Sequence, residues 1–418
     1  MIPLLRRVLA RIVKTGNLWV HTESATPDRF GDGTGPPRVI RIADRRTQWH
    51  LVVDPELAFG EAYMSGRLTV VSGTLYDVIA LLMENIAATP LPRYARGVEF
   101  LRRAVRTLLY YNPRTRALAN ARHHYDVDPR IYDLFLDSDR QYSCAYFASA
   151  DHDLEAAQRA KKRHIAAKLA LGPGMTVCDI GSGWGGLAIY LASVAGANVL
   201  GVTLSERQLA ASQQSALANG RSGTVHFERR DYRDITGVYD RVVSVGMLEH
   251  VGTGQYDAYF GKIAEILADD GVALVHTIAR IDDARGITNP FIVRYIFPGG
   301  YVPALSELAP SIERARLVVT DIEVLRLHYA QTLRAWRTRF LARREEAEHI
   351  AGAEFCRMWE AYLAGSEAAF RYQNLVVLQI QLTRRLDAVP LTRDYIAAAE
   401  DRLARQERSA KITRIAGE

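Results

Sequence analysis

Cysteine is scarce in this chain, whose 418 residues include only Cys144, Cys178 and Cys356. An odd number of cysteines without metal-ligand spacing suits a reducing cytoplasm and argues against a disulfide scaffold. Long apolar runs are also absent, because Asp179 and many glycines interrupt the longest charge-poor stretch. The sequence therefore predicts no transmembrane segment.

The N-terminal twenty residues lack the apolar core of a signal peptide, since Arg6, Arg7 and Arg11 interrupt it. Their spacing predicts an amphipathic helix instead. Its apolar face holds Leu5, Val8, Leu9, Ile12 and Val13. Such a helix either packs on its own domain or contacts a membrane surface.

Three regions follow from composition. Residues 1–90 predict a smaller α+β domain, with strands near Val39–Ile42 and Trp49–Val53, a loop over 24–37 and a helix over Leu75–Ile86. Residues 91–122 are strongly basic and predict a linker, which is either simply solvated or a patch for phospholipid headgroups or nucleic acid. No zinc-finger, RNP or helix-turn-helix signature favours nucleic acid, so we expect none. Residues 123–418 predict the α/β domain, with an irregular segment over Phe291–Pro310 and long helices over Gln331–Glu348 and Glu354–Gln373, which we expect to bind the substrate.

A glycine turn at Gly181–Gly186 carries the strongest signal in the α/β region. The apolar run Met175–Ile180 precedes it, and a helix-like segment, Leu187–Val194, and a second apolar run, Asn198–Leu204, follow. Glycines let the backbone curl and approach a ligand closely. The order predicts the first half of a Rossmann-like domain, with a mostly parallel sheet and helices on both faces.

Three details favour S-adenosylmethionine (SAM) over a dinucleotide as the ligand. Asp179 precedes the first glycine, where a carboxylate disfavours a pyrophosphate but tolerates a sulfonium or an amino group. The second apolar run ends in Thr203-Leu204-Ser205, without the acid that usually binds a ribose. Asp231 and Tyr232 follow a third apolar run and are placed to flank an adenine. A purely structural glycine turn is the remaining alternative.

Nine motifs together resemble the cyclopropane-fatty-acid synthase family, which includes mycolic acid cyclopropane synthases and related SAM-dependent lipid methyltransferases. The matching strings are GEAYMSGRL (Gly60–Leu68), YSCAYF (Tyr142–Phe147), DIGSGWGGLA (Asp179–Ala188), GVTLSERQ (Gly201–Gln208), DYRD (Asp231–Asp234), DRVVSVGMLEHVG (Asp240–Gly252), HTI (His276–Ile278), YIFPGGYVP (Tyr295–Pro303) and HYAQTLRAW (His328–Trp336). One departure is Ser182, where the family usually carries cysteine.

The resemblance implies a class I SAM-dependent methyltransferase that acts on the cis double bond of an unsaturated acyl chain in a membrane phospholipid. A carbocation forms, and bound bicarbonate removes a proton so that a cyclopropane closes. The positions matching the bicarbonate site are Cys144, Glu249, His276 and Tyr329, with the Ile278 backbone nearby. Those matching the SAM site are Tyr142, Ser143, Asp179, Gly181, Gly183, Thr203, Gln208, Asp231 and Tyr232.

The residues themselves support part of this chemistry. Glu249 ends the apolar run Val242–Leu248, and His276 follows Val272–Val275, so both should lie at the carboxyl edge of a parallel sheet. A carboxylate beside bicarbonate is a like-charge pair, which predicts a raised pKa. Structural alternatives stay open: Glu249 as a surface acid or helix cap, and His276 as a hydrogen-bonded core residue.

Similar alternatives apply to the other candidates, because Tyr329 could merely pack at a helix start and Cys144 could be inert. An alkene needs no activating base before attack, only proximity, stabilisation of a cation and a late base. Aromatic faces can stabilise that cation. The candidates are Tyr142, Tyr146, Phe147, Tyr295, Phe297 and Tyr301.

Other functions remain in view at this point. The same scaffold could give a methyl-branched or methylene acyl chain, and more distant relatives methylate alkaloid or polyamine nitrogens. The first domain could be only a lipid-binding or dimerising module. An NAD oxidoreductase is disfavoured by the missing acid after Thr203. We expect a homodimer, cytoplasmic and peripherally bound to the inner face of the membrane.

Overall fold

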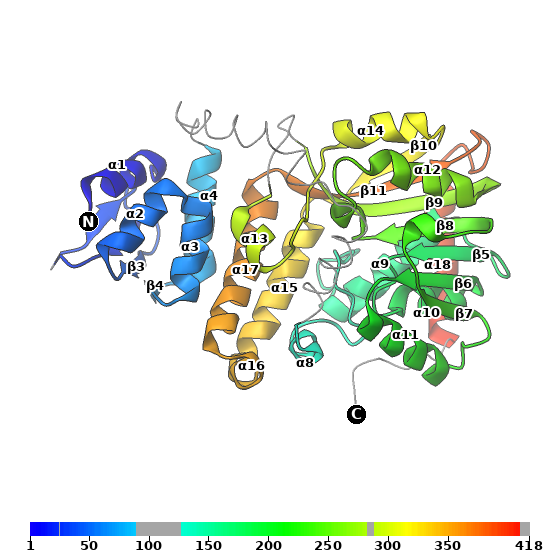
Figure 1. Ribbon diagram of the computed structural model, residues 1–418, viewed down its shortest axis with the longest axis horizontal. Helices are drawn as coiled ribbons and strands as arrows, with labels where there is room; N and C mark the ends of the chain where they lie inside the picture. Colours follow the sequence, from blue (N-terminus) through cyan, green and yellow to red (C-terminus); the bar gives the residue numbers. More distant parts are fainter. Residues whose placement is uncertain (25, 89–126, 282–287, 410–418) are drawn as a thin grey trace.

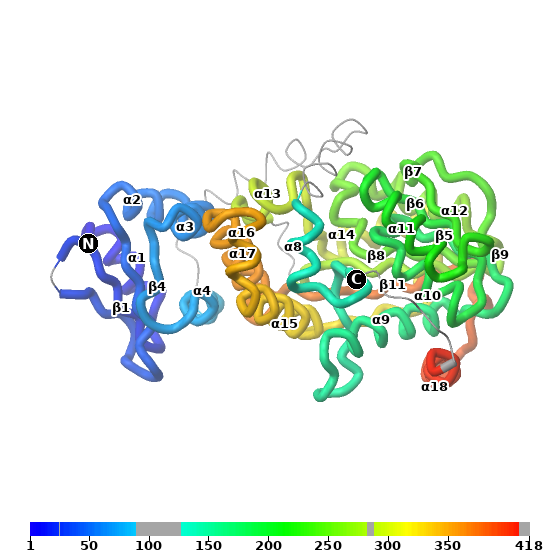
Figure 2. Tube along the Cα trace, turned by 90° about the horizontal axis from the view of Figure 1, so that it is seen from below, coloured from blue at the N-terminus to red at the C-terminus, as the bar shows by residue number. Residues whose placement is uncertain are grey.

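The computed structural model describes residues 1–24, 26–88, 127–281 and 288–409, so the basic linker predicted at 91–122 lies outside the described residues. The N-terminal elements form one end of the molecule and a large sheet forms the other (Figure 1). A group of helices lies between them, and the turned view shows the same order (Figure 2).

The N-terminal end is a four-stranded mixed sheet with four helices, as the α+β prediction required. Its strands are β1 (Leu18–His21), β2 (Asp28–Phe30), β3 (Arg38–Ile42) and β4 (Leu68–Ser72), in the order β2-β1-β3-β4. Its helices are α1 (Pro3–Ile12), α2 (Arg45–Val53), α3 (Pro55–Met64) and α4 (Leu75–Ala87). The pair β1–β3 is parallel and the other two pairs are antiparallel.

Two local predictions in this region are wrong. The expected strand Trp49–Val53 is the second half of α2, which begins because the Asp44 carboxylate accepts a hydrogen bond from Thr47 N at 2.7 Å. A short apolar run alone does not distinguish helix from strand. The expected loop over 24–37 contains β2, whose Phe30 pairs with Leu18 and is buried.

The amphipathic helix is present as α1, and its apolar face packs on its own domain. Leu5 and Val13 are buried in the N-terminal core, with Leu9 and Ile12 packed against it. This contact supports the first of the two alternatives for that face. In the part of the chain that the structure describes, no helix combines the length and the apolar character needed to cross a bilayer.

The other end is a seven-stranded sheet of order β10-β11-β9-β8-β5-β6-β7, in which β11 runs antiparallel to both of its neighbours. Its strands are β5 (Thr176–Ile180), β6 (Asn198–Thr203), β7 (Val225–Arg229), β8 (Tyr239–Val245), β9 (Leu267–Arg280), β10 (Val318–Val324) and β11 (Leu375–Thr383). The five strands β5 to β9 are mutually parallel.

Helices cover both faces of this sheet, as predicted, and further helices form the group between the sheet and the N-terminal end (Figure 1). The elements are α8 (Pro129–Asp133), α9 (Leu154–Lys168), α10 (Gly186–Ala195), α11 (Glu206–Ala218), η1 (Tyr232–Asp234), η2 (Leu248–His250), α12 (Tyr256–Ile266), α13 (Pro290–Tyr295), α14 (Leu305–Arg314), α15 (His328–Ala342), α16 (Arg344–Ala351), α17 (Ala353–Tyr372) and α18 (Asp394–Ser409). Val243 and Leu274 pack with α9, α10 and α18, whereas the alternate residues Val242 and Val275 pack with α12 and α14.

The structure corrects several boundaries. The segment expected to be irregular, Phe291–Pro310, contains most of α13 and the first half of α14. The helix expected over Gln331–Glu348 is divided at Arg343 into α15 and α16. The strand expected over Val242–Leu248 ends at Val245, and β9 continues to Arg280 because β11 pairs with its whole second half.

The N-terminal end packs on α17 and α13 through α3 and α4. Gly60 is required there, because a Cβ at this position would lie 2.3 Å from Phe291 Cδ2. Tyr63 donates a hydrogen bond to Glu360 Oε2 at 2.8 Å, and Tyr295 donates to Glu61 Oε1 at 2.8 Å. The GEAYMSGRL motif is therefore a contact surface between the two parts.

Candidate active site

The glycine turn after β5 has the backbone conformations that its sequence requires. Gly181 and Gly183 have φ values of +84° and +55°, which L side chains rarely adopt. A Cβ on Gly185 would lie 2.7 Å from Phe227 Cζ, and one on Gly201 would lie 2.6 Å from the same ring. Close approach of β6, β7 and the turn therefore depends on glycine at these positions.

The turn borders a cavity of about 200 Å³ at the carboxyl edge of the sheet. Its lining includes every residue predicted for SAM: Tyr142, Ser143, Asp179, Gly181, Gly183, Thr203, Gln208, Asp231 and Tyr232. These nine residues come from four separate segments of the sequence, so the fold gathers them. The lining also includes Arg140, Trp184, Met247 and His250, which sequence reasoning missed.

Burial and hydrogen bonds to neighbouring residues determine the state of the polar groups that line the cavity. Asp179 is 2% exposed, its Oδ2 has no hydrogen-bond partner among the described residues, and burial raises its pKa to about 7. Thr203 Oγ1 donates to Gln208 Oε1 at 2.9 Å, so these two lining residues contact each other. Asp231 is held by two hydrogen bonds from the Arg233 guanidinium, at 2.8 and 2.7 Å.

Lys161, which sequence reasoning missed, holds the segment that carries Tyr142 and Ser143. The side chain is fully buried in α9, and Nζ donates to Gln141 Oε1 at 2.7 Å and to Ser143 Oγ at 2.8 Å. Gln158 Nε2 donates to the Ser143 carbonyl at 3.0 Å. Helical spacing could have identified Lys161 from the sequence, because Gln158, Lys161 and Ile165 fall on one face of the helix.

The residues predicted for bicarbonate lie in an adjacent region rather than in the lining of this cavity. Cys144 and Tyr329 belong to one buried cluster with Trp184 and Trp336, and Ile278 packs against it. Glu249, in η2, accepts a hydrogen bond from the Ile278 backbone N–H at 2.6 Å. His276 lies two residues before Ile278 on the same face of β9, and its Nδ1 is 3.3 Å from Gln379 Nε2.

Burial also decides the charges of these side chains. It raises the pKa of Glu249 to about 7, against the opposing effect of the Ile278 hydrogen bond. The cause is burial, and not the neighbouring anion from which we predicted a raised pKa. Burial, with smaller effects from Lys161 and Lys168, lowers the pKa of His276 to about 3, so the imidazole is neutral. Burial raises the pKa of Cys144, whose thiol donates to the Ala145 carbonyl at 3.3 Å. A protonated thiol is a poor nucleophile.

Two polar atoms in this region, Glu249 Oε2 and His276 Nε2, are buried and have no hydrogen-bond partner among the described residues. Such atoms in a native structure usually contact water or an ion. A carboxyl group that carries a proton and an imidazole N–H can each donate a hydrogen bond to a small oxyanion. The residues therefore fit the group that the resemblance implies.

The six aromatic residues predicted as candidates for stabilising a cation do not form a single cluster. Tyr142 packs against Trp336 at 5.2 Å and Phe297 at 6.4 Å between ring centroids. Tyr146 instead stacks on His164 and His328. The Tyr301 side chain packs on the opposite face of the sheet, although its backbone N–H donates to the Glu249 carbonyl at 2.9 Å. Tyr295 contacts the N-terminal end.

The sheet order, the glycine turn and the cavity define a class I SAM-dependent methyltransferase. Residues 112–380 match the family model described as mycolic acid cyclopropane synthetase. The cyclopropane-fatty-acyl-phospholipid synthase of Escherichia coli strain K12 is 36% identical over 356 residues, which cover 84% of this chain and 89% of that protein. The chain belongs to this family.

Further relatives agree. The tuberculostearic acid methyltransferase of Mycobacterium tuberculosis is 35% identical over 340 residues, covering 78% of this chain and 79% of that protein. The solved cyclopropane synthase of Mycobacterium tuberculosis is 32% identical with a TM-score of 0.62, covering 65% of this chain and 98% of that one. A mycolic acid cyclopropane synthase solved with SAH and CTAB is 33% identical with a TM-score of 0.61, covering 65% and 99%.

Proposed function

We propose that this methyltransferase converts the cis double bond of an unsaturated phospholipid acyl chain into a cyclopropane. The nine lining residues would hold SAM, and Cys144, Glu249, His276 and Tyr329 would hold bicarbonate, with the Ile278 backbone nearby. The observation that carries the proposal is a pair of buried polar atoms, Glu249 Oε2 and His276 Nε2, for which the described residues offer no hydrogen-bond partner.

SAM supplies a methyl group whose transfer forms a bond to one alkene carbon and leaves a thioether and a carbocation. The cluster around Tyr142 and Trp336 presents aromatic faces that stabilise such a cation without being alkylated. The ring closes when a proton leaves the new methyl group and its C–H electrons form the third bond of the ring. Bicarbonate, when bound, would supply the base for that proton.

The protein's own residues have distinct tasks in this scheme. The Ile278 N–H orients Glu249 Oε1, so that Oε2 is free to contact the anion. With a pKa of about 7, Glu249 can carry the proton that relieves repulsion between two anions. Neutral His276 adds no charge to the site. The protonated thiol of Cys144 either takes no part in the reaction or donates a weak hydrogen bond to the anion.

A second product deserves equal testing, because one relative at 35% identity is a tuberculostearic acid methyltransferase. The same carbocation would then lose its proton elsewhere and give a methyl-branched or methylene chain. The presence of all four side-chain types of the bicarbonate site favours ring closure.

We further propose that residues 1–90 dock on the inner face of the membrane and that the enzyme is a cytoplasmic, peripheral homodimer. The exposed face of α1 carries Arg6, Arg7 and Arg11, which suits anionic headgroups. Leu4 and Trp49 are 42% and 49% exposed and could enter the interfacial region. Flotation with phosphatidylglycerol vesicles tests this docking, and binding unaffected by charge reversal of the three arginines would contradict it.

The decisive experiment incubates the enzyme with SAM and vesicles of an unsaturated phosphatidylethanolamine. NMR of the recovered acyl chains distinguishes cyclopropane from a methylene isomer of equal mass. We expect cyclopropane, with a rate that falls when bicarbonate is stripped from the buffer and recovers when it is restored. A methylene product, or a rate indifferent to bicarbonate, would refute ring closure by this site.

A further inference from the structure

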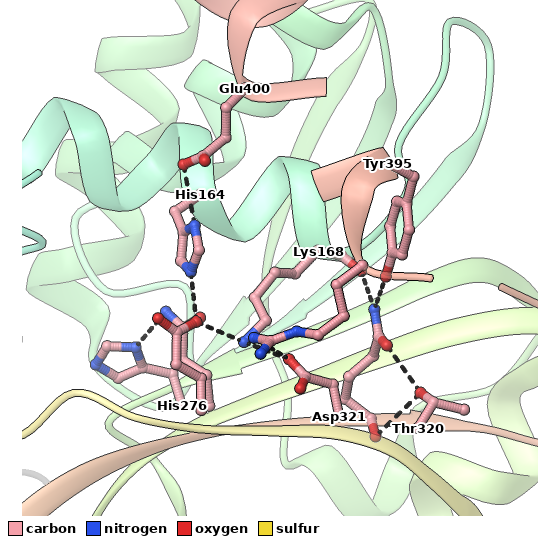
Figure 3. Close-up of polar contacts among 11 residues, drawn as sticks. His164, Lys168, His276, Thr320, Asp321, Tyr395 and Glu400 are labelled. Atoms are coloured by element: carbon pink, nitrogen blue, oxygen red, sulfur yellow. Dashed lines mark hydrogen bonds and ion pairs between the residues drawn. The ribbon is translucent and has the colours of Figure 1, made fainter. Parts of the chain in front are cut away.

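Three polar side chains lie side by side across the strands that flank the site. In the sheet register Glu323 of β10 faces Gln379 of β11, and Gln379 faces His276 of β9. Gln379 is fully buried, and its Nε2 lies 3.3 Å from His276 Nδ1. All three side chains lie on the face of the sheet that α9 covers, and the polar contacts around them are drawn in Figure 3.

The far end of this row is firmly anchored. Glu323 Oε2 accepts hydrogen bonds from His164 Nε2 at 2.7 Å and from Lys168 Nζ at 2.8 Å, and both donors come from α9 (Figure 3). Lys168 also pairs with Asp321 at 2.9 Å. In the sheet register Gln379 therefore lies between a fixed carboxylate and the imidazole, and its Oε1 has no hydrogen-bond partner among the described residues.

A neutral imidazole carries its single proton on one of two nitrogens, and the neighbour of one nitrogen decides the role of the other. An amide N–H facing Nδ1 makes Nδ1 the acceptor and leaves the proton on Nε2. Nε2 is the buried atom without a partner among the described residues. In histidine ligands of metals, such outer contacts set the tautomer in the same way.

We propose that Gln379 is a positioning residue, which holds His276 as the Nε2–H tautomer so that Nε2 donates a hydrogen bond to the bound anion. The anion itself rests on the proposed function, whereas the tautomer does not. The reversed amide would accept from Nδ1–H and turn the Nε2 lone pair toward an anion. That arrangement is repulsive, so a bound anion favours the orientation of Gln379 in which Nε2 faces His276 Nδ1.

Two variants and one control test the proposal. Gln379→Met removes the hydrogen bond at similar volume, and Gln379→Glu replaces the amide donor with an acceptor. The control is Gln381→Met, because Gln381 is equally buried on the same face of β11 but contacts Tyr395 and the Lys168 carbonyl. Ring ¹⁵N chemical shifts of histidine-labelled full-length enzyme, assigned with His276→Asn, report the tautomer without substrate.

We expect a protonated Nε2 in the wild type and the control, and a protonated Nδ1 in Gln379→Glu. Gln379→Met should raise the KM for bicarbonate about 10- to 100-fold, the usual cost of losing an outer contact to a histidine ligand, with SAM affinity unchanged. A wild type protonated on Nδ1, or a Gln379→Glu variant that keeps the wild-type tautomer, overturns the proposal. If the tautomers behave as expected but bicarbonate has no effect on any variant, the proposed function fails and the positioning role stands.

Discussion

Glu249 offers a prediction that links stability to function. The pKa of this carboxyl rises from 4.5 to about 7 on folding, because the side chain is buried. A raised pKa means that the folded state prefers the neutral acid, so its contribution to stability is complete below 4.5 and is lost as the pH rises through 7. Glu249→Gln removes this titration and keeps an oxygen to accept the Ile278 N–H.

The size of the effect follows from the two pKa values. Each pKa unit corresponds to about 1.4 kcal/mol. Between about pH 5 and about pH 8 the wild type should lose about 2–3 kcal/mol more than Glu249→Gln in its free energy of unfolding. Costs of the substitution that do not depend on pH cancel in this double difference.

Urea unfolding at both pH values, followed by circular dichroism, measures the double difference. The control is Glu313→Gln, which replaces an exposed carboxylate of α14 and should follow the wild type. The same Glu249→Gln protein should bind SAM normally and lose about 10²- to 10⁴-fold in turnover, the usual loss when a positioned proton-transfer group is removed. Parallel pH dependences for wild type and Glu249→Gln would refute the buried, titrating carboxyl, and normal turnover would remove Glu249 from the site.

Three further predictions concern neighbouring residues. Gly201→Ala should cost about 1–3 kcal/mol in urea unfolding, because a Cβ would lie 2.6 Å from Phe227, whereas Gly261→Ala in the open middle of α12 should be neutral or stabilising; equal effects would contradict the packing argument. Lys161→Met should weaken SAM binding about tenfold by calorimetry, the scale of about one lost hydrogen bond, and an unchanged Kd would show that Ser143 needs no anchor. Cys144→Ser should keep turnover within about tenfold, since a thiol of raised pKa is no nucleophile; complete inactivity in a folded protein would point to cysteine chemistry.

The SAM cavity was largely predictable because its signals are local. Gly181 and Gly183 mark backbone conformations that other residues avoid. Asp179 and Thr203 lie at the carboxyl ends of the strands β5 and β6, which the apolar runs predict. Position after a parallel strand also placed Glu249 correctly at the sheet edge. The N-terminal errors arose where a short apolar run, Trp49–Val53, fits either a strand or a helix.

The contacts of His276 and of Lys161 were not predictable in the same way. Gln379 reaches His276 only because β11 enters the sheet between β9 and β10, against the direction of its neighbours. Lys161 has the sequence of an ordinary helix cation, and its burial depends on how α9 packs under the Tyr142–Ser143 segment.

By itself, then, the amino-acid sequence determined the fold class, the glycine turn and the residues that line the cavity, since these depend on backbone preferences and on neighbours along the chain. Only the tertiary structure decided which buried groups share a contact: Glu249 with the Ile278 N–H, Ser143 with Lys161, and His276 with Gln379. The physical reason is that strand order and helix packing bring together side chains that lie far apart in sequence. Burial of these side chains then sets their pKa values, and their hydrogen-bond partners set where the protons lie.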